Sequence, residues 1–240
     1  MHEPGEEPAL VGLRLEERGF RLDRHLVVDD LAHPHRFNPL PPADDVDLLV
    51  VMGSVRSVYD TATIGAWIGP ELNLIHTCHG LGIPVLGICF GGQALAAALG
   101  GSVERAPRPE VGWFELDSSG RVGGRPDPVG SGPWFEWHHD RFVPPPEAEI
   151  LASSSVGSQL FRCGRSVGTQ FHPEVDADHV AGWLAGTADH YLAEVGTSRR
   201  QMIDDTARLA GPSAVNCRRL VDWFCDEVMP GPVRPVGSPG

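Results

Sequence analysis

The chain has 240 residues and 41% of them are hydrophobic, which is enough for one large α/β domain or two smaller ones with a buried core. Its formal net charge is −13 and it contains no basic run, which argues against nucleic acid or an anionic membrane as a partner. All 19 basic residues are arginines, so Schiff-base chemistry on a lysine and a P-loop lysine are both excluded.

The five cysteines are odd in number and lack metal-type spacing, so we expect free thiols in a reducing cytosol. They are Cys78, Cys89, Cys163, Cys217 and Cys225. The acidic N-terminus has no apolar segment of the signal-peptide kind. No apolar run approaches the roughly 18 residues that a membrane span needs, and we predict a cytoplasmic protein without membrane contact.

Helical and extended patterns alternate through the first hundred residues. The predicted order is helix 10–18, strand 26–28, strand 46–52, helix 62–80, strand 83–88 and helix 93–99. The run 46–52 is almost continuously apolar, as is typical of a buried parallel strand. This alternation predicts a parallel, doubly wound sheet.

The start of the chain departs from this pattern. A sheet of this kind normally opens with a strand before its first helix, whereas here the chain begins almost at the helix with Met1-His2-Glu3-Pro4. Either the fold lacks this strand or the sequence is truncated, and truncation is our expectation.

The second half of the chain has a different organisation. Short strands separated by Gly, Pro and Ser are predicted around 111–116, 150–154, 159–162 and 167–171, as antiparallel additions to the sheet. We expect a surface loop over 120–133, a helix over 176–195 and one or two helices over 199–229 with a break near Gly211-Pro212. The Pro/Gly-rich tail 230–240 is predicted to be disordered.

One cysteine lies where the strand 83–88 turns sharply into a helix. The segment reads Gly87-Ile88-Cys89-Phe90-Gly91-Gly92-Gln93. A nucleophile in such an elbow is exposed at the turn, and the next backbone N–H can hold an oxyanion. The helix N-terminus also lowers the pKa of a thiol at this position. A cysteine in an apolar context is otherwise a small core residue, so the elbow alone is a weak signal.

A second segment supplies the groups that a thiol nucleophile needs. It reads Gly168-Thr169-Gln170-Phe171-His172-Pro173-Glu174. His172 can take the proton of Cys89, and Glu174, two positions on, can orient the imidazole. Such a site forms an acyl-thioester, whose oxyanion needs two donors. We expect them to be the main-chain N–H groups of Phe90 and of Gly53, which follows the strand 46–52.

The two segments and three further motifs resemble the class I (triad) glutamine amidotransferases. The order Cys…His-x-Glu is that of the family, and the resemblance covers roughly residues 1 to 190. The similarity is greatest to stand-alone proteins that resemble the glutaminase domain of GMP synthase. The motifs are Met52-Gly53-Ser54 with Val58-Tyr59-Asp60, Glu110-Val111-Gly112-Trp113 and Trp137-His138-His139-Asp140.

The resemblance implies a flavodoxin-like three-layer α/β/α fold with a mostly parallel central sheet. The antiparallel β-region is added to this sheet, residues 1–195 form the amidotransferase-like domain, and 196–229 form a helical extension. It also implies hydrolysis of the side-chain amide of L-glutamine by Cys89, His172 and Glu174. Gln93, His138 and His139 are then expected to line the glutamine pocket.

No Ser-Gly-Gly pyrophosphate loop and no Walker A motif are present, so we expect an ammonia-accepting synthetase or other partner in trans, and no cofactor or metal. A γ-glutamyl hydrolase or peptidase of the same fold, and a non-catalytic regulatory subunit, remain alternatives. His138 and His139 could equally be structural in an aromatic corner, and Tyr59 could lie in a solvated loop. His76, Cys78 and His79 lack a fourth ligand nearby, so we do not expect a metal site there. Core packing is the preferred interpretation of Cys217 and Cys225, which lie on roughly one face of the C-terminal helix.

Overall fold

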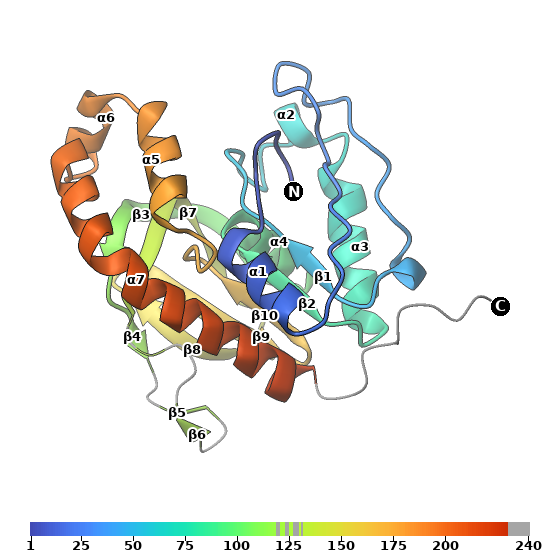
Figure 1. The fold of residues 1–240 in the computed structure, drawn as a ribbon. Coiled ribbons are helices and arrows are strands. Elements are labelled where there is room, and N and C mark those ends of the chain that lie inside the picture. The colour runs from blue at the N-terminus through green and yellow to red at the C-terminus, as the bar shows by residue number, and fades with distance from the viewer. Residues whose placement is uncertain (119–120, 123–124, 127–129, 131, 230–240) are drawn as a thin grey trace.

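The computed structural model describes residues 1–118, 121–122, 125–126, 130 and 132–229. Its main sheet has six strands in the order β1-β2-β10-β9-β8-β4 (Figure 1). The parallel strands are β1 (Leu49–Val51), β2 (Val85–Ile88) and β10 (Ser166–Thr169). The antiparallel strands are β9 (Gly157–Cys163), β8 (Glu149–Ser154) and β4 (Asp117–Ser118). The parallel strands and the antiparallel additions were both predicted from the sequence.

Helices cover both faces of this sheet and create two separate apolar layers. On one face lie α1 (Ala9–Glu17) and α7 (Arg199–Trp223), and on the other α3 (Ile68–Gly80) and α4 (Phe90–Ala98) (Figure 1). Along β2, Leu86 packs in the layer of α1 and α7, and Val85 packs in the layer of α3 and α4. Because successive strand side chains point to opposite faces, an all-apolar strand serves both layers. This explains the continuous apolar run in the sequence.

Two of the predicted helices are each divided in two. The prediction over 62–80 corresponds to α2 (Thr61–Ile64) and α3, separated at Gly65–Trp67, and α2 begins where the Asp60 side chain accepts the N–H of Thr63. The prediction over 176–195 corresponds to α5 (Ala177–Ala185) and α6 (Asp189–Glu194). A short 3-10 helix (Ala43–Asp45) precedes β1.

A long hairpin forms a second sheet beside the main one. β3 (Ser102–Phe114) pairs antiparallel with β7 (Trp134–Val143), so the strand predicted over 111–116 is the end of a longer one. The pairing shifts register between Arg105 and Glu110, where the segment contains two prolines that cannot donate to the ladder. Within the predicted loop 120–133, β5 (Arg121–Val122) pairs with β6 (Arg125–Pro126), and the other residues lie largely outside the described part.

Two sequence predictions are wrong. Residues 26–28 do not form a strand. In the described part of the chain, Val27 forms main-chain hydrogen bonds to Met1 and Asn38 and has no strand beside it. The helix α7 continues through Pro212 without the predicted break and ends in a π-helical turn (Phe224–Val228). Gly211 and Pro212 are exposed, so water can satisfy the carbonyl that the missing proline N–H leaves free. The tail 230–240 lies outside the described residues.

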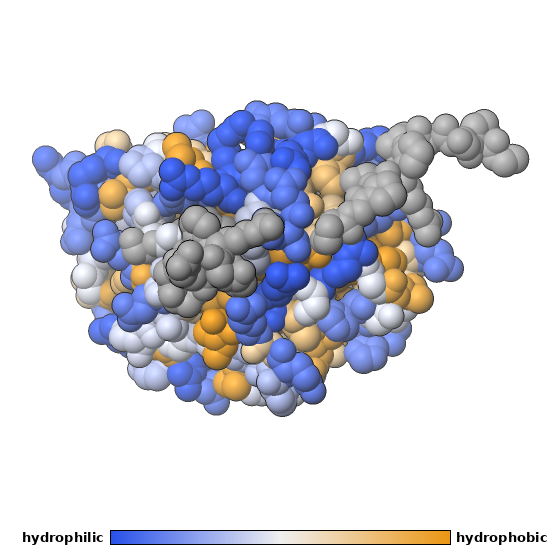
Figure 2. All heavy atoms as spheres, turned by 90° about the horizontal axis from the view of Figure 1, so that it is seen from below, coloured by the Kyte–Doolittle hydropathy of each residue, from blue (hydrophilic) through white to orange (hydrophobic). Residues whose placement is uncertain are grey.

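The surface mixes residue types. Figure 2 shows the molecule from below, with hydrophilic and apolar residues interspersed over the visible face. α1 contacts α7 through an ion pair in which Arg14 donates to both carboxylate oxygens of Asp222. Among the described residues, no helix combines the length and the apolar character that crossing a membrane requires.

Candidate active site

Cys89 lies at the strained turn between β2 and α4. Its φ of 51° and ψ of −108° fall in a region that side chains other than glycine rarely adopt. The turn is held from both sides, because Cys89 N–H donates to Thr169 O at 2.9 Å and Gly91 N–H donates to Met52 O at 3.0 Å. These bonds place Cys89 at the N-cap of α4, as the sequence predicted for an elbow.

The glycines after Cys89 allow α4 to approach the sheet. A Cβ atom on Gly91 would lie 2.0 Å from Val51 O, and one on Gly92 would lie 2.3 Å from Thr169 O. Both distances are far inside van der Waals contact. Any side chain here would therefore push the helix N-terminus, and with it Cys89, away from the strand ends.

His172 and Glu174 follow β10 and lie beside the elbow. His172 N–H donates to Phe135 O at 2.8 Å, which ties this segment to β7, and Nδ1 of His172 lies 2.7 Å from Oε1 of Glu174. The imidazole packs edge-on against Trp183, with the ring centres 5.1 Å apart. Leu10 N–H of α1 donates to the main-chain carbonyl of Glu174 at 3.1 Å and thereby fixes the backbone of that residue.

The electrostatics of His172 favour its charged form. Burial acts to lower its pKa, but the charge of Glu174, the charge of Cys89 and hydrogen bonds to both side chains raise the pKa well above its ordinary value. The imidazole thus interacts with a sulfur on one side and a carboxylate on the other. This is the arrangement in which a thiol can lose its proton to a neighbouring base.

A cavity of about 670 Å³ opens above these groups. Its lining includes Gly53, Cys89, Phe90, His172 and Glu174. The size is that of pockets that hold small ligands. The predicted oxyanion residues Gly53 and Phe90 therefore border the same cavity as the predicted nucleophile.

Gln93 also borders the cavity, but its side chain is engaged within the protein. It is 3% exposed, and its Nε2 donates to Asp140 O at 3.3 Å and to Gln170 Oε1 at 3.2 Å. Nε2 of Gln170 in turn lies 3.7 Å from the sulfur of Cys89. The side-chain amide of Gln93 is thus linked to the sulfur of Cys89 through the side chain of Gln170, and it helps to hold this wall of the cavity in place.

His138 is enclosed by two buried carboxylates. Its Nε2 lies 3.3 Å from Glu110 Oε2 and 3.2 Å from Glu136 Oε2, and its Nδ1 lies 2.9 Å from Asp140 O. Burial acts to lower the pKa of His138, but Glu110 and Glu136 raise it to about 10. The imidazolium supplies the positive charge that this cluster needs.

The same three residues have the only metal-type geometry among the described residues, with ligand atoms of Glu110, Glu136 and His138 within 4.8 Å of one another. His76 and His79, which flank Cys78, instead contact Ala98 O and Ser166 Oγ, and burial raises the pKa of the Cys78 thiol to about 11.

His139 and Asp140 face the cavity mouth. His139 Nε2 lies 3.3 Å from the hydroxyl of Tyr191, and burial lowers the pKa of His139. Asp140 accepts hydrogen bonds from the hydroxyls of Ser57 and Tyr59, the latter at 2.8 Å. Tyr59 therefore anchors its loop to β7, which sequence reasoning did not anticipate.

The N-terminal residues were not predicted to belong to the site, yet they border it. His2 is buried, with Nδ1 2.6 Å from Gly53 O and Nε2 2.9 Å from Glu71 Oε1. Glu3 accepts from the hydroxyl of Ser54, and Glu6 lies close to Gly53 and accepts the N–H of His2. No local pattern in the sequence indicates this role, because His2 reaches Gly53 only through a tertiary contact.

Comparison with known proteins identifies the family. The model of the class-I glutamine amidotransferases matches residues 14–180. The chain therefore belongs to the class-I glutamine amidotransferase family, and the predicted family and fold class are confirmed.

Relatives of known name are longer than this chain. The GMP synthase [glutamine-hydrolyzing] of Methylobacillus flagellatus is 32% identical over 178 residues, which are 69% of this chain and 31% of that protein. The GMP synthase of Aeropyrum pernix is 39% identical over 125 residues, 50% of this chain and 23% of that protein. The chain thus spans less than a third of these relatives.

Solved structures match nearly the whole fold. A glutamine amidotransferase from Thermotoga maritima has a TM-score of 0.77 and 25% identity, covering 95% of this chain and 96% of that one. A glutamine amidotransferase from Methylobacillus flagellatus has a TM-score of 0.79 and 25% identity, covering 93% and 91%.

Proposed function

We propose that this chain hydrolyses the side-chain amide of L-glutamine with Cys89 as nucleophile, His172 as base and Glu174 as the group that orients the base. One observation carries the proposal. His172 interacts with the sulfur of Cys89 at a strained elbow and has its Nδ1 2.7 Å from Glu174, all at one cavity. These are the three roles that a thiol-based amide hydrolase needs.

The reaction proceeds in two steps. The thiol proton passes to His172, the sulfur attacks the amide carbon, and the C–N bond breaks as the imidazole returns the proton to the leaving nitrogen. Ammonia leaves and a γ-glutamyl thioester remains. Water then loses a proton to His172 and attacks the thioester, which releases glutamate and restores the thiol.

The main-chain N–H groups of Gly53 and Phe90 stabilise the oxyanion in both steps. Both residues border the cavity, and Phe90 begins α4, whose dipole favours negative charge at this end. Gln93, His138 and His139 bind or shape the glutamine pocket. Of these, His139 is the most accessible, since Gln93 and His138 are almost fully buried.

The ammonia is delivered to an acceptor enzyme in trans. Support comes from the GMP synthases, of which this chain matches only a minor part of the length. An acceptor on another protein would carry out the function of the part of the GMP synthases that this chain does not match. The chain alone then carries out the glutaminase half-reaction, in the cytoplasm.

The test is release of ammonia and glutamate from L-glutamine by the full chain and by Cys89→Ala and Cys89→Ser. We expect both variants to be inactive and a glutamine-like electrophile to label Cys89 in the unmodified chain. Cys163→Ala is the matched control, because Cys163 lies at the end of β9 and does not border the cavity. Full activity of Cys89→Ala would refute the mechanism. Activity on γ-glutamyl amines but not on glutamine would favour the γ-glutamyl hydrolase instead.

A further inference from the structure

His2 contacts both residues that are proposed to hold the oxyanion. Its Nδ1 lies 2.6 Å from the main-chain oxygen of Gly53. Its ring also meets the ring of Phe90 edge-on, with the ring centres 4.7 Å apart. Gly53 lies just after β1 and Phe90 begins α4, so the two residues belong to separate elements. One buried side chain therefore links the two halves of the proposed oxyanion site.

The imidazole of His2 is itself fixed from the opposite side. Its Nε2 lies 2.9 Å from Oε1 of Glu71, which lies in the first turn of α3. The indole of Trp67, just before α3, stacks on the imidazole with the ring centres 5.5 Å apart. His2 is 1% exposed and Glu71 is 5% exposed, so water has little access to these contacts. The ring cannot turn without breaking a buried hydrogen bond.

These contacts determine which ring nitrogens of His2 carry protons. A main-chain carbonyl can only accept a hydrogen bond, so Nδ1 donates to Gly53 O. Nε2 faces the carboxylate of Glu71, which also accepts. Burial acts to lower the pKa of His2, but the charge of Glu71 and the hydrogen bond to it raise the pKa above its ordinary value. His2 is therefore an imidazolium that donates from both nitrogens.

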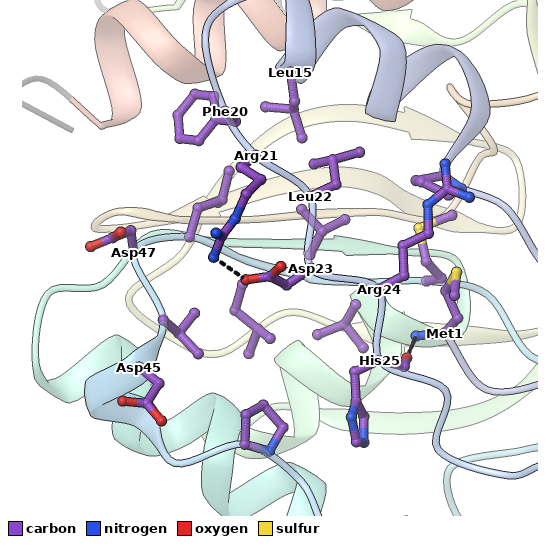
Figure 3. Close-up of a pocket in the computed structure, with 18 of the residues that line it drawn as sticks. Met1, Leu15, Phe20, Arg21, Leu22, Asp23, Arg24, His25, Asp45 and Asp47 are labelled. Carbon is purple, nitrogen blue, oxygen red and sulfur yellow. Dashed lines mark hydrogen bonds and ion pairs between the residues drawn. The ribbon is translucent and has the colours of Figure 1, made fainter. Parts of the chain in front are cut away.

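The main chain of the same segment is also held in place. Met1 borders a second cavity of about 460 Å³, where its amino group donates to His25 O at 3.0 Å (Figure 3). The carbonyl of Met1 accepts from Val27 N–H at 2.8 Å. The N–H of His2 donates to Oε2 of Glu6 at 2.6 Å. The imidazole of His2 thus extends from a fixed backbone and can act as a rigid support.

Gly53 needs such a support, because glycine restricts its own backbone least of all residues. A larger residue would crowd the proposed base, since a Cβ atom at this position would lie 3.3 Å from Cε1 of His172. An oxyanion donor must nevertheless lie about 2.7–3.1 Å from the oxygen that it stabilises. The hydrogen bond from His2 to Gly53 O fixes the peptide group that follows Gly53 and so limits rotation about the backbone bonds of the glycine.

We propose that His2 is a positioning residue for glutamine hydrolysis, which keeps the N–H groups of Gly53 and Phe90 aligned on the oxyanion while Glu71 fixes the imidazolium. This inference rests on the proposed function, because it concerns the oxyanion donors of that reaction. The amide oxygen gains its negative charge only as the tetrahedral intermediate forms, so misplaced donors weaken binding of the transition state and not of the substrate. Loss of His2 should therefore lower kcat and leave KM nearly unchanged.

The test compares three substitutions of His2 in the full chain, with L-glutamine as substrate. Asparagine can place its amide nitrogen where Nδ1 lies and still donate to Gly53 O, glutamine places it nearer to the position of Nε2, and leucine has no donor. We expect His2→Leu and His2→Gln to lower kcat by about 10- to 100-fold with KM within about threefold, and His2→Asn to retain kcat within about fivefold. His76→Leu is the matched control, because His76 also contacts a main-chain carbonyl, that of Ala98, and does not border the site.

Two further measurements separate positioning from a general loss of structure. Iodoacetamide reacts with a thiolate at its CH₂ carbon, where no oxyanion forms, so we expect alkylation of Cys89 in His2→Leu to stay within about twofold of the unmodified rate. Amide hydrogen exchange of residues 53–55 reports on the loop directly. It should be about tenfold or more faster in His2→Leu and close to the unmodified rate in His2→Asn.

Two results would overturn the inference. In one, His2→Leu retains the kcat of the unmodified chain. In the other, its kcat falls together with an equal slowing of Cys89 alkylation and a raised KM, which indicates loss of structure and not of donor alignment. Failure of the proposed function looks different, because the unmodified chain would then release no ammonia from glutamine. In that case unchanged exchange of residues 53–55 in His2→Leu would still refute the support of the loop by His2, and faster exchange would uphold it.

Discussion

The buried charge cluster around His138 predicts a stability that falls as the pH rises. The imidazole has a pKa of about 10 in the folded chain, against 6.5 for the ordinary side chain. The folded state therefore holds a proton that the unfolded state loses first. This stabilisation is complete below about pH 6.5 and disappears as the pH approaches about 10. Burial also raises the pKa of Glu136, and this shift likewise makes the folded state less stable as the pH rises.

The magnitude follows from the proton linkage. Between the two pKa values, each pH unit removes about 1.4 kcal/mol of folding free energy. From about pH 7 to about pH 9 the upper limit of the lost folding free energy is therefore roughly 3 kcal/mol. Because His138 lies within 3.3 Å of two carboxylates, its titration is coupled to its surroundings, and we expect a loss of about 1–3 kcal/mol.

The assay is urea-induced unfolding of the full chain and of His138→Gln at both pH values. The glutamine cannot titrate, and groups that titrate elsewhere, such as Cys78, contribute equally to both proteins. We expect His138→Gln to be less stable at the lower pH, because two carboxylates lose their cation, and the difference to shrink at the higher pH. Equal losses in the two proteins would show that His138 is not charged in the folded chain.

Three further predictions concern single residues. Glu174→Gln should lower the rate of glutamine hydrolysis by about 10²-fold or more with little change in KM, as measured by steady-state kinetics, because it no longer stabilises the charged imidazole. Gly92→Ala should cost about 2 kcal/mol or more in urea unfolding, because its Cβ would meet Thr169 O at 2.3 Å; a neutral result would mean that α4 can shift freely. Arg14→Ala should cost no more than about 1 kcal/mol, since its ion pair with Asp222 is partly exposed, and a larger loss would show that this contact fixes α1 on α7.

The parts of the site that were predictable are encoded over short stretches of sequence. The elbow needs a strand, a nucleophile and small residues within a few positions, and the residues 87–93 contain all of them. His172 and Glu174 are two positions apart in an extended segment, so one local pattern places both side chains together. Family resemblance then linked the two segments, which no periodicity could do.

The parts that were missed depend on contacts between distant segments. β7 contains Trp134, Phe135 and Trp137 on both faces and therefore lacks the alternation that marks a half-buried strand, although it pairs along its length with β3. Residues 26–28 have strand propensity but no strand beside them, so tertiary context overrides the propensity. His2 becomes a site residue only because Gly53 lies next to it in the folded chain.

The N-terminal residues connect the segment after α1 with the cavity of the candidate active site. Met1 is hydrogen-bonded to His25 and Val27, and the adjacent His2 is hydrogen-bonded to the carbonyl of Gly53, whose N–H is proposed to hold the oxyanion. β1 ends at Val51, two residues before Gly53. A displacement of this part of the chain would therefore reach the oxyanion loop by two routes, one through the hydrogen bond between His2 and Gly53 and one along the backbone that follows β1. Because these routes are only one or two residues long, the position of Met1 and the geometry of the oxyanion loop depend on each other.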